Sequence, residues 1–592
     1  MTYRAPVNDF KFLFDHVVGL DRLAQTDKFA ETSADLTDAI LSEAAKLSEQ
    51  VLAPLQRPGD LQPAVLENGV VRTSPGFAEG YRQIAEGGWI GMAASPENGG
   101  MGLPMTVTTA VNEMMGSACL SLELNPLMSQ GQIEALEHHA SDQIKAVYLP
   151  KLISGEWSGT MNLTEAQAGS DVGALSTKAV PNGDGSYAVS GQKIFISWGD
   201  NDFTEHVCHL VLARLPDGAA GTKGISLFMV PKLIPDDNGE PGVANSLRVV
   251  SLEHKMGLHG SPTAVMDYDN ATGWLVGEPH KGMAAMFTMM NNARLGVGVQ
   301  GLSSAEAAYQ HALNFALERK QGRSPVDGGT GTIVDHADVR RMLLTMKAEV
   351  FAARAIALSC AMAIDLGNAT GDAHWKSRAA LLTPINKAFG TDTGIRVSEL
   401  GVQVHGGMGF IEETGAAQYS RDVRVTAIYE GTNGIQAMDL VGRKMMDGGA
   451  AAFTLIDEIK AHARSAKDQA LAEPLAHAAE ALRTATQALV ASGAMNDRFA
   501  GAVPYLSGFA RVLGGYYHLL AAEAEGQNGP RRKLARFYIH RMLPEHAGLL
   551  PMPRRGPMTF MRFPQTIWQA DDRRLRTHPL PDGNAPRRGR RA

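Results

Sequence analysis

The chain has 592 residues, of which 44% are hydrophobic and 20% charged, a composition typical of a globular protein. Its net charge of −7 argues against a surface that binds nucleic acid in general. The length allows about four domains and a large buried core.

The N-terminal stretch MTYRAPVNDFKFLFDHVVGLDRL interrupts its apolar residues with charges every few positions, so it lacks the apolar core of a secretory signal. No window approaches the roughly 18 apolar residues that a membrane span requires. The cysteines Cys119, Cys208 and Cys360 are far apart and form no CxxC pair, which predicts neither a disulfide framework nor a metal site. We therefore expect a cytoplasmic protein without membrane attachment.

Amino-acid composition and hydrophobic periodicity divide the chain into successive blocks. Ala/Leu/Glu-rich helical segments, broken by the glycine-rich loop SPENGGMGLP, give way to short β-branched runs typical of antiparallel strands, and helices then return. A glycine break, DGGAA, precedes another helical block. The predicted organisation is an N-terminal arm (1–34), a helical domain (35–157), a β domain (158–282), a helical bundle (283–447), an additional C-terminal helical domain (448–550) and an Arg/Pro-rich tail (551–592).

This order predicts an α+β fold with segregated helices and strands, not alternating βαβ units. The absence of GxGxxG after a strand also argues against a Rossmann domain, and the GGMG groups at 99–102 and 406–409 lack that context. The tail has no helical period, which favours disorder. Contact of its basic residues with nucleic acid or anionic lipid is the less favoured alternative.

Four segments carry the residue types of a chemical site: 161–177 (MNLTEAQAGSDVGALST), 191–199 (GQKIFISWG), 316–323 (ALERKQGR) and 400–436, which ends in YEGTNGIQ. Each has an ordinary structural explanation when taken alone. The first reads as a Ser-rich turn, and the second as a strand whose Phe195 and Ser197 share one face. Arg319 in the third reads as a solvated helix charge, and Glu430 in the fourth as an acid at a helix start.

Taken together, the segments resemble the acyl-CoA dehydrogenase family of flavoenzymes. TEAQAGSDV is similar to its TEPxAGSD motif, GQKIFIS to its GxKxWIT strand, ERKQ to ERxxF, and QVHGGMGF, RDVR and YEGT to its C-terminal motifs. GWIGMAASPENGGMGLP also resembles the family's N-terminal stretch. The resemblance covers roughly residues 35–445 and implies a helical domain, a β-barrel-like domain and a helical bundle, with FAD at their junction.

The resemblance implies that Glu430 is the catalytic base that removes the α-proton of an acyl-CoA thioester. Burial between flavin and substrate should raise its pKa toward the working pH. Some relatives carry the base on an earlier helix, where this chain has Ala293, which cannot act as a base. The other implied substrate contacts are Ser170, Arg294, Tyr429 and Gly431.

FAD is the implied cofactor. The implied contacts are Met161, Leu163, Thr164, Gly169, Ser170, Phe195, Ser197, Arg319, Gln321, His336, Gln403, Gly407 and Thr432. In the family the adenosine diphosphate half is reached across a subunit interface, so we expect a homo-oligomer, a dimer or a tetramer. Met161, Gln167, Phe195 and Gly434 depart from the common family residues, and an insertion after RKQGR makes the assignment of His336 depend on the alignment.

The N-terminal arm and the added helical block resemble a large bacterial subgroup that includes enzymes acting on 3-methylmercaptopropionyl-CoA in dimethylsulfoniopropionate demethylation. Short or medium straight-chain acyl-CoAs remain the alternative substrates, because a pocket discriminates weakly between a thioether and a methylene. Electron-transfer flavoprotein is the implied electron acceptor, and an acyl-CoA oxidase, which uses oxygen, is the alternative. A nucleic-acid-associated flavoprotein like AidB is the alternative of another class, and the net charge and the YEGT base argue against it.

Overall fold

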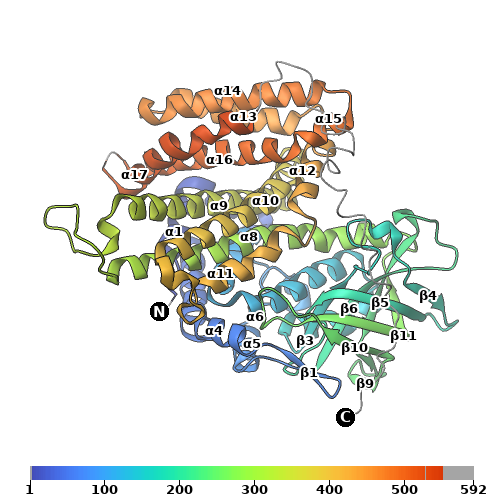
Figure 1. The fold of residues 1–592 in the computed structure, drawn as a ribbon. Helices are drawn as coiled ribbons and strands as arrows, with labels where there is room; N and C mark the ends of the chain where they lie inside the picture. Colours follow the sequence, from blue (N-terminus) through green and yellow to red (C-terminus); the bar gives the residue numbers. More distant parts are fainter. Residues whose placement is uncertain (1–2, 527, 551–592) are drawn as a thin grey trace, which may run out of the picture.

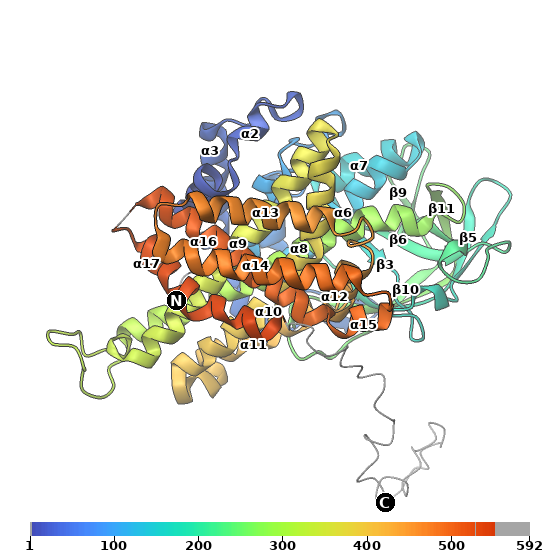
Figure 2. The same cartoon turned by 90° about the horizontal axis from the view of Figure 1, so that it is seen from above.

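The computed structural model describes residues 3–526 and 528–550. A helical N-terminal part and a β-sheet lie beside a bundle of long helices (Figure 1). Further helices, drawn in orange and red, cover the bundle on the side away from the sheet (Figures 1 and 2). This arrangement confirms the predicted α+β class. The predicted tail, residues 551–592, lies outside the described residues.

The N-terminal part is centred on one long buried helix, α6, whose backbone is non-helical at Cys119. A hairpin interrupts this otherwise helical region, because Asn68 and Gly69 both adopt positive φ, as a tight Asn-Gly turn requires. The elements of this part are α1 (Val7–Leu13), η1 (Phe14–Val18), α2 (Asp21–Ala24), η2 (Asp27–Phe29), α3 (Ala34–Lys46), η3 (Leu47–Leu52), η4 (Ala53–Leu55), α4 (Gln56–Leu61), β1 (Val65–Glu67), β2 (Val70–Arg72), α5 (Phe77–Glu86), η5 (Pro96–Asn98), α6 (Met105–His139) and α7 (Asp142–Ser154).

The β domain closes on itself. Strand β11 pairs with both β5 and β7, and β6 pairs with β7 and β4, which in turn pairs with β5. Most strand pairs are antiparallel, as predicted, but β3 and β4 run parallel to β6, which the prediction did not include. The strands are β3 (Trp157–Asn162), β4 (Lys178–Pro181), β5 (Tyr187–Ser197), β6 (His206–Arg214), β7 (Ile225–Pro231), β8 (Leu233–Pro235), β9 (Pro241–Ala244), β10 (Leu247–Leu252) and β11 (Thr263–Val276), with η6 (Val172–Ala174) and η7 (Thr222–Gly224) between them.

Three long helices, α8, α9 and α10, form the bundle. In α9 an 18-residue window has the hydropathy of a membrane span, an exception to the sequence expectation, but 89% of that window is buried inside the described fold. It is therefore a core helix of this bundle. The bundle elements are α8 (Gly282–Glu318), η8 (Ile333–Asp335), α9 (Ala337–Thr370), α10 (Ala373–His405), η9 (Gly406–Phe410), η10 (Glu412–Thr414), α11 (Ala416–Val423), η11 (Arg424–Ala427) and α12 (Asn433–Gly442).

The added C-terminal helices pack on α9, α10 and α12 (Figure 2). Buried Arg511 on α16 pairs with Glu349 on α9 at 2.9 Å, and Glu545 pairs with Arg396 on α10 at 3.1 Å, so ion pairs fasten this layer to the bundle. Its elements are α13 (Ala450–Ser465), α14 (Gln469–Ala491), α15 (Met495–Ala500), α16 (Ala502–Glu525), α17 (Pro530–Phe537), η12 (Tyr538–Met542), η13 (Leu543–Glu545) and α18 (His546–Leu549).

The N-terminal arm is fixed to the same layer through Asp9 on α1. Its carboxylate lies 2.9 Å from Lys347 Nζ, 2.8 Å from Arg531 Nη2 and 3.8 Å from Arg354 Nη1. Although burial opposes ionisation, these three cations hold the pKa of Asp9 well below its usual range. The two ends of the described chain thus meet at one carboxylate.

Candidate active site

Glu430 lies in the tight connection between η11 and α12. Its φ is 53° and that of Gly431 is 82°, so two successive residues adopt the left-handed region. Such a conformation in a non-glycine residue costs of order 1–3 kcal/mol and is found mostly at functional sites. The buried Gln436 side chain stabilises the turn by donating to the Glu430 carbonyl at 3.0 Å, and the Thr432 hydroxyl caps α12 by accepting from Ile435 N at 3.3 Å.

Two cations act on the Glu430 carboxyl. Burial raises its pKa to about 7, because desolvation outweighs the attraction of Arg294 and Lys387. Arg294 on α8 is buried, and its Nη1 lies 4.0 Å from Asp439. A carboxyl that titrates near neutral pH suits a general base, because both protonation states are accessible at the working pH.

Lys387 also belongs to this site, although the sequence does not indicate it. It is completely buried on α10, burial lowers its pKa to about 8, and its Nζ donates to Asn433 Oδ1 at 3.0 Å. Asn433 Nδ2 in turn donates to Asp392 at 2.7 Å, which ties the start of α12 to α10. A lone lysine in a helix gives no sequence signal, so only the packing of α10 against α12 identifies it.

Tyr429 points into the protein. Its hydroxyl donates to Gln300 Oε1 on α8 at 2.5 Å, and burial raises its pKa well above the usual range. The structure therefore brings four predicted substrate-side residues together at one place: Arg294, Tyr429, Glu430 and Gly431.

A second group of predicted residues lies at the end of β3 and on β5. Met161, Leu163 and Thr164 are partly buried, and Thr164 O accepts from Ile194 N at 2.9 Å, which joins the two segments. Phe195 has a φ of 61° and is 58% exposed, whereas Ser197 is partly buried. The β5–β11 register shifts at this point, which turns the aromatic ring outward.

A buried ion pair joins these two segments and was missed by the sequence reasoning. Lys193 Nζ lies 2.8 Å from Glu165, and it also donates to Leu163 O at 3.0 Å. Glu165 accepts further bonds from Ser176 N at 2.7 Å and from the Thr177 hydroxyl at 2.6 Å. These interactions explain the Glu of TEAQAGSD and the Lys of GQKIFIS, because together they fix the main chain around Leu163 and Thr164.

The remaining predicted cofactor residues lie elsewhere. Gly169 and Ser170 are exposed beyond β3. Exposed Arg319 and Gln321 follow the end of α8, and His336 Nε2 contacts Gln321 O at 2.9 Å. Exposed Gln403 and Gly407 lie where α10 ends.

These positions constrain how one chain could hold FAD. The exposed Phe195 ring and the neighbouring main chain fit a planar flavin, and a Cβ added at Gly169 or Gly407 would meet nothing within 4 Å. The residues at the end of β3 and on β5 therefore fit the flavin ring, and Arg319, Gln321, Gln403 and Gly407 lie exposed at the ends of α8 and α10.

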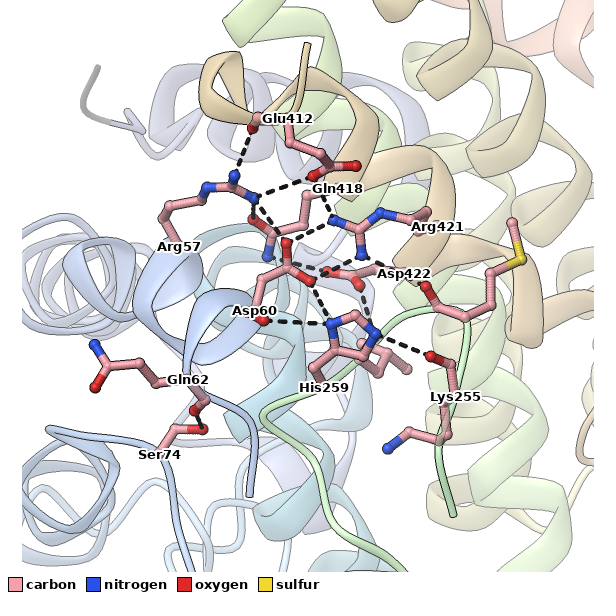
Figure 3. A network of polar contacts seen from close by, with 12 residues as sticks. Arg57, Asp60, Gln62, Ser74, Lys255, His259, Glu412, Gln418, Arg421 and Asp422 are labelled. Atoms are coloured by element: carbon pink, nitrogen blue, oxygen red, sulfur yellow. Dashed lines mark hydrogen bonds and ion pairs between the residues drawn. The ribbon is translucent and has the colours of Figure 1, made fainter. Parts of the chain in front are cut away.

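A polar network holds the segment that leads to Glu430 (Figure 3). Asp60 on α4 accepts from Arg421 on α11 at 2.6 Å and lies 2.8 Å from His259 Nδ1. Asp422 accepts from Leu258 N at 2.6 Å, and burial raises its pKa to about 6. The RDVR motif thus joins the helical N-terminal part, the β domain and the bundle.

Comparison with known families agrees with this architecture. Family models match the N-terminal domain (residues 38–156), middle domain (160–271) and C-terminal domain (280–446) of acyl-CoA dehydrogenases, and the "Acetyl-CoA dehydrogenase C-terminal like" model matches residues 455–564. The chain therefore belongs to the acyl-CoA dehydrogenase family, whose members are FAD-dependent oxidoreductases.

Individual relatives narrow the comparison. The chain is 46% identical to the 3-methylmercaptopropionyl-CoA dehydrogenase of Ruegeria pomeroyi, over 89% of this chain and 93% of the relative. It is 34% identical to a butyryl-CoA dehydrogenase of Syntrophomonas wolfei, over 80% and 81% of the two chains. The solved structure of Caenorhabditis elegans ACDH-11 in complex with C11-CoA is similar in fold, with a TM-score of 0.75, 20% identity and 91% of both chains covered.

Proposed function

We propose that this acyl-CoA dehydrogenase converts 3-methylmercaptopropionyl-CoA to 3-methylthioacryloyl-CoA. The 46% identity to the Ruegeria pomeroyi enzyme over nearly the whole chain supports this substrate. The observation that supports this reaction is the environment of Glu430, a carboxyl with a pKa of about 7 in a left-handed turn near two cationic side chains.

Glu430 accepts the α-proton of the thioester as the α-carbon–hydrogen bond breaks. FAD, which the segments around Leu163, Thr164 and Phe195 would hold, would supply the two-electron oxidation by which the β-carbon loses a hydride and a carbon–carbon double bond forms in the product. Arg294 and Lys387 favour the carboxylate form of Glu430 before the reaction. The main chain at Leu163 and Thr164, fixed by the Glu165–Lys193 pair, would orient the ring against the substrate.

We further propose that electron-transfer flavoprotein reoxidises the flavin, that the enzyme acts in the cytoplasm and that it forms at least a homodimer. The exposure of Arg319, Gln321, Gln403 and Gly407 supports the last point, because such residues reach the cofactor across a subunit interface in the family that the chain resembles. Sedimentation of the FAD-loaded protein tests it, and a monomer that retains FAD would contradict it.

Short straight-chain acyl-CoAs are the second candidate substrates, favoured by the 34% identity to a butyryl-CoA dehydrogenase. A thioether and a methylene differ little in size, so shape alone separates the candidates weakly.

The test is anaerobic reduction of the bound flavin by 3-methylmercaptopropionyl-CoA, butyryl-CoA, hexanoyl-CoA and octanoyl-CoA in turn, with Glu430→Gln as the inactive control. Fast bleaching by the sulfur substrate, absent in the variant, is expected. Bleaching only by straight chains would transfer the proposal to the second candidate. A flavin reduced by none of them would refute both and favour an AidB-like role, which salt-dependent retention on DNA would then reveal.

A further inference from the structure

The side chain of Asn433, in the first turn of α12, lies between two charged groups of α10. Its Oδ1 accepts from Lys387 Nζ at 3.0 Å, and its Nδ2 donates to Asp392 Oδ1 at 2.7 Å and to the Thr391 hydroxyl at 3.0 Å. An ammonium can only donate and a carboxylate can only accept, so these neighbours fix which end of the amide faces which group. The amide therefore bridges a completely buried cation and a carboxyl group that reaches the surface.

The ammonium group of Lys387 depends on this amide. Asn433 Oδ1 is its one hydrogen-bond partner among the residues that the structure describes. Burial lowers the pKa of Lys387 to about 8, so the ammonium is already close to losing its proton near neutral pH. A buried ammonium that loses its partner bears the full cost of its desolvation, and it releases its proton instead of staying charged. An intact amide at Asn433 thus keeps Lys387 charged.

The charge of Lys387 acts on the turn that carries the base. The charged groups that influence this ammonium are Glu430, Asp392 and Arg294, and those that influence the Glu430 carboxyl are Arg294 and Lys387. Arg294 Nη1 also lies 4.0 Å from the Asp439 carboxylate, which offsets part of its charge. Lys387 forms no such ion pair among the described residues, so its charge acts mainly on Glu430 and Asp392.

The same side chain also fixes the main chain beside the base. The Thr432 hydroxyl caps α12, and Gln436 Nε2 donates to the Glu430 carbonyl at 3.0 Å, so the left-handed turn and the start of α12 form one hydrogen-bonded unit. Asn433 fastens this unit to α10, since its Nδ2 also contacts Ala388 O at 3.4 Å. One side chain therefore connects the position of the base with the cation that acts on it.

We infer that Asn433 is a positioning residue for the base, because its amide fastens the first turn of α12 to α10 and holds a charged Lys387 toward Glu430. The inference rests on the proposed dehydrogenation with Glu430 as the base. A charged Lys387 favours the carboxylate form of Glu430, which is the form that accepts the α-proton. Without the amide Lys387 becomes neutral, and Glu430 keeps its own proton up to a higher pH.

The test is the pH dependence of flavin reduction in the FAD-loaded protein, measured by stopped-flow absorbance with 3-methylmercaptopropionyl-CoA, or with butyryl-CoA where only that thioester reduces the flavin. Asn433→Ala should move the midpoint of the profile to higher pH by about one pH unit, the lower end of the effect of one opposite charge. Asp392→Asn, a substitution at an exposed position, should move the midpoint in the same direction but less, because the Asp392 carboxylate also favours a charged Lys387.

A double variant separates this role from a general loss of stability. In protein that already carries Lys387→Met, Asn433→Ala should cause no further shift of the midpoint, because both changes remove the same charge. Asn245→Ala is the matched control. Asn245 is a buried asparagine of the β domain whose Nδ2 donates to Pro231 O and Thr272 O at 2.8 Å, so its loss weakens the fold without affecting Lys387. This control should leave the midpoint unchanged.

Two results would overturn the inference: an Asn433→Ala midpoint equal to that of the wild type, or a further shift when Asn433→Ala is added to Lys387→Met. Where Asn433→Ala does not fold, the exposed variant Asp392→Asn decides, and a midpoint equal to that of the wild type overturns the inference. A wild type whose flavin is reduced by no acyl-CoA would instead refute the proposed function.

Discussion

Replacing Glu430, the proposed base, with glutamine should stabilise the protein at the pH at which the base is proposed to work. The pKa of Glu430 is raised from an ordinary 4.5 to about 7, and each unit corresponds to about 1.4 kcal/mol. The folded state therefore binds this proton more tightly than the unfolded chain does. The contribution of this bound proton to the free energy of unfolding is fully present below about pH 4.5 and is lost as the pH rises through about 7. The contribution amounts to roughly 3 kcal/mol in total.

Glu430→Gln cannot lose this contribution, because the amide does not titrate. The free energy of unfolding of the variant minus that of the wild type should rise by roughly 2.5 kcal/mol between pH 5 and pH 8. Equilibrium urea unfolding of both proteins at the two pH values, followed by tryptophan fluorescence, measures this difference. Glu67→Gln, at an exposed glutamate on β1, is the control substitution. Equal differences at both pH values would refute the desolvation of Glu430.

Three further predictions concern the same region. The rate of flavin reduction by substrate should fall about tenfold for each pH unit below about 7, because only the Glu430 carboxylate accepts the proton. Stopped-flow absorbance measures this rate. A rate that does not change with pH would place the base elsewhere. Lys387→Met should raise the pKa of Glu430 and move this profile to higher pH, whereas Lys387→Arg should restore it. Glu165→Gln or Lys193→Met alone should lower the free energy of unfolding by about 3–5 kcal/mol, since each leaves a buried charge without its partner. The double variant should lose less, and urea unfolding that shows additive losses would contradict the pairing.

The sequence predicted the family and the order of helices and strands, because these depend on local periodicity and short contiguous motifs. The role of Glu430 as the base stays a prediction. The YEGT motif is visible in the sequence, and so is the strand that carries Phe195 and Ser197. The outward turn of Phe195 could not be predicted, because it follows from a shift of register between β5 and β11.

Contacts that depend only on tertiary packing could not be predicted from the sequence either. Lys387 and Asn433 are single polar residues on different helices, and their contact depends on how α10 packs against α12. The parallel pairing of β3 with β6 joins segments separated by about 50 residues, for which strand patterns alone carry no direction.

The contact between Asp9 and Arg531 has a consequence for synthesis on the ribosome. Asp9 is made before its partner Arg531, which follows 522 residues later. At about 5–20 residues per second, this interval is roughly half a minute to two minutes. During that time the arm can pair with α9 but lacks its last cation. Docking of the N-terminal arm onto α17 must therefore wait until α17 has left the ribosome.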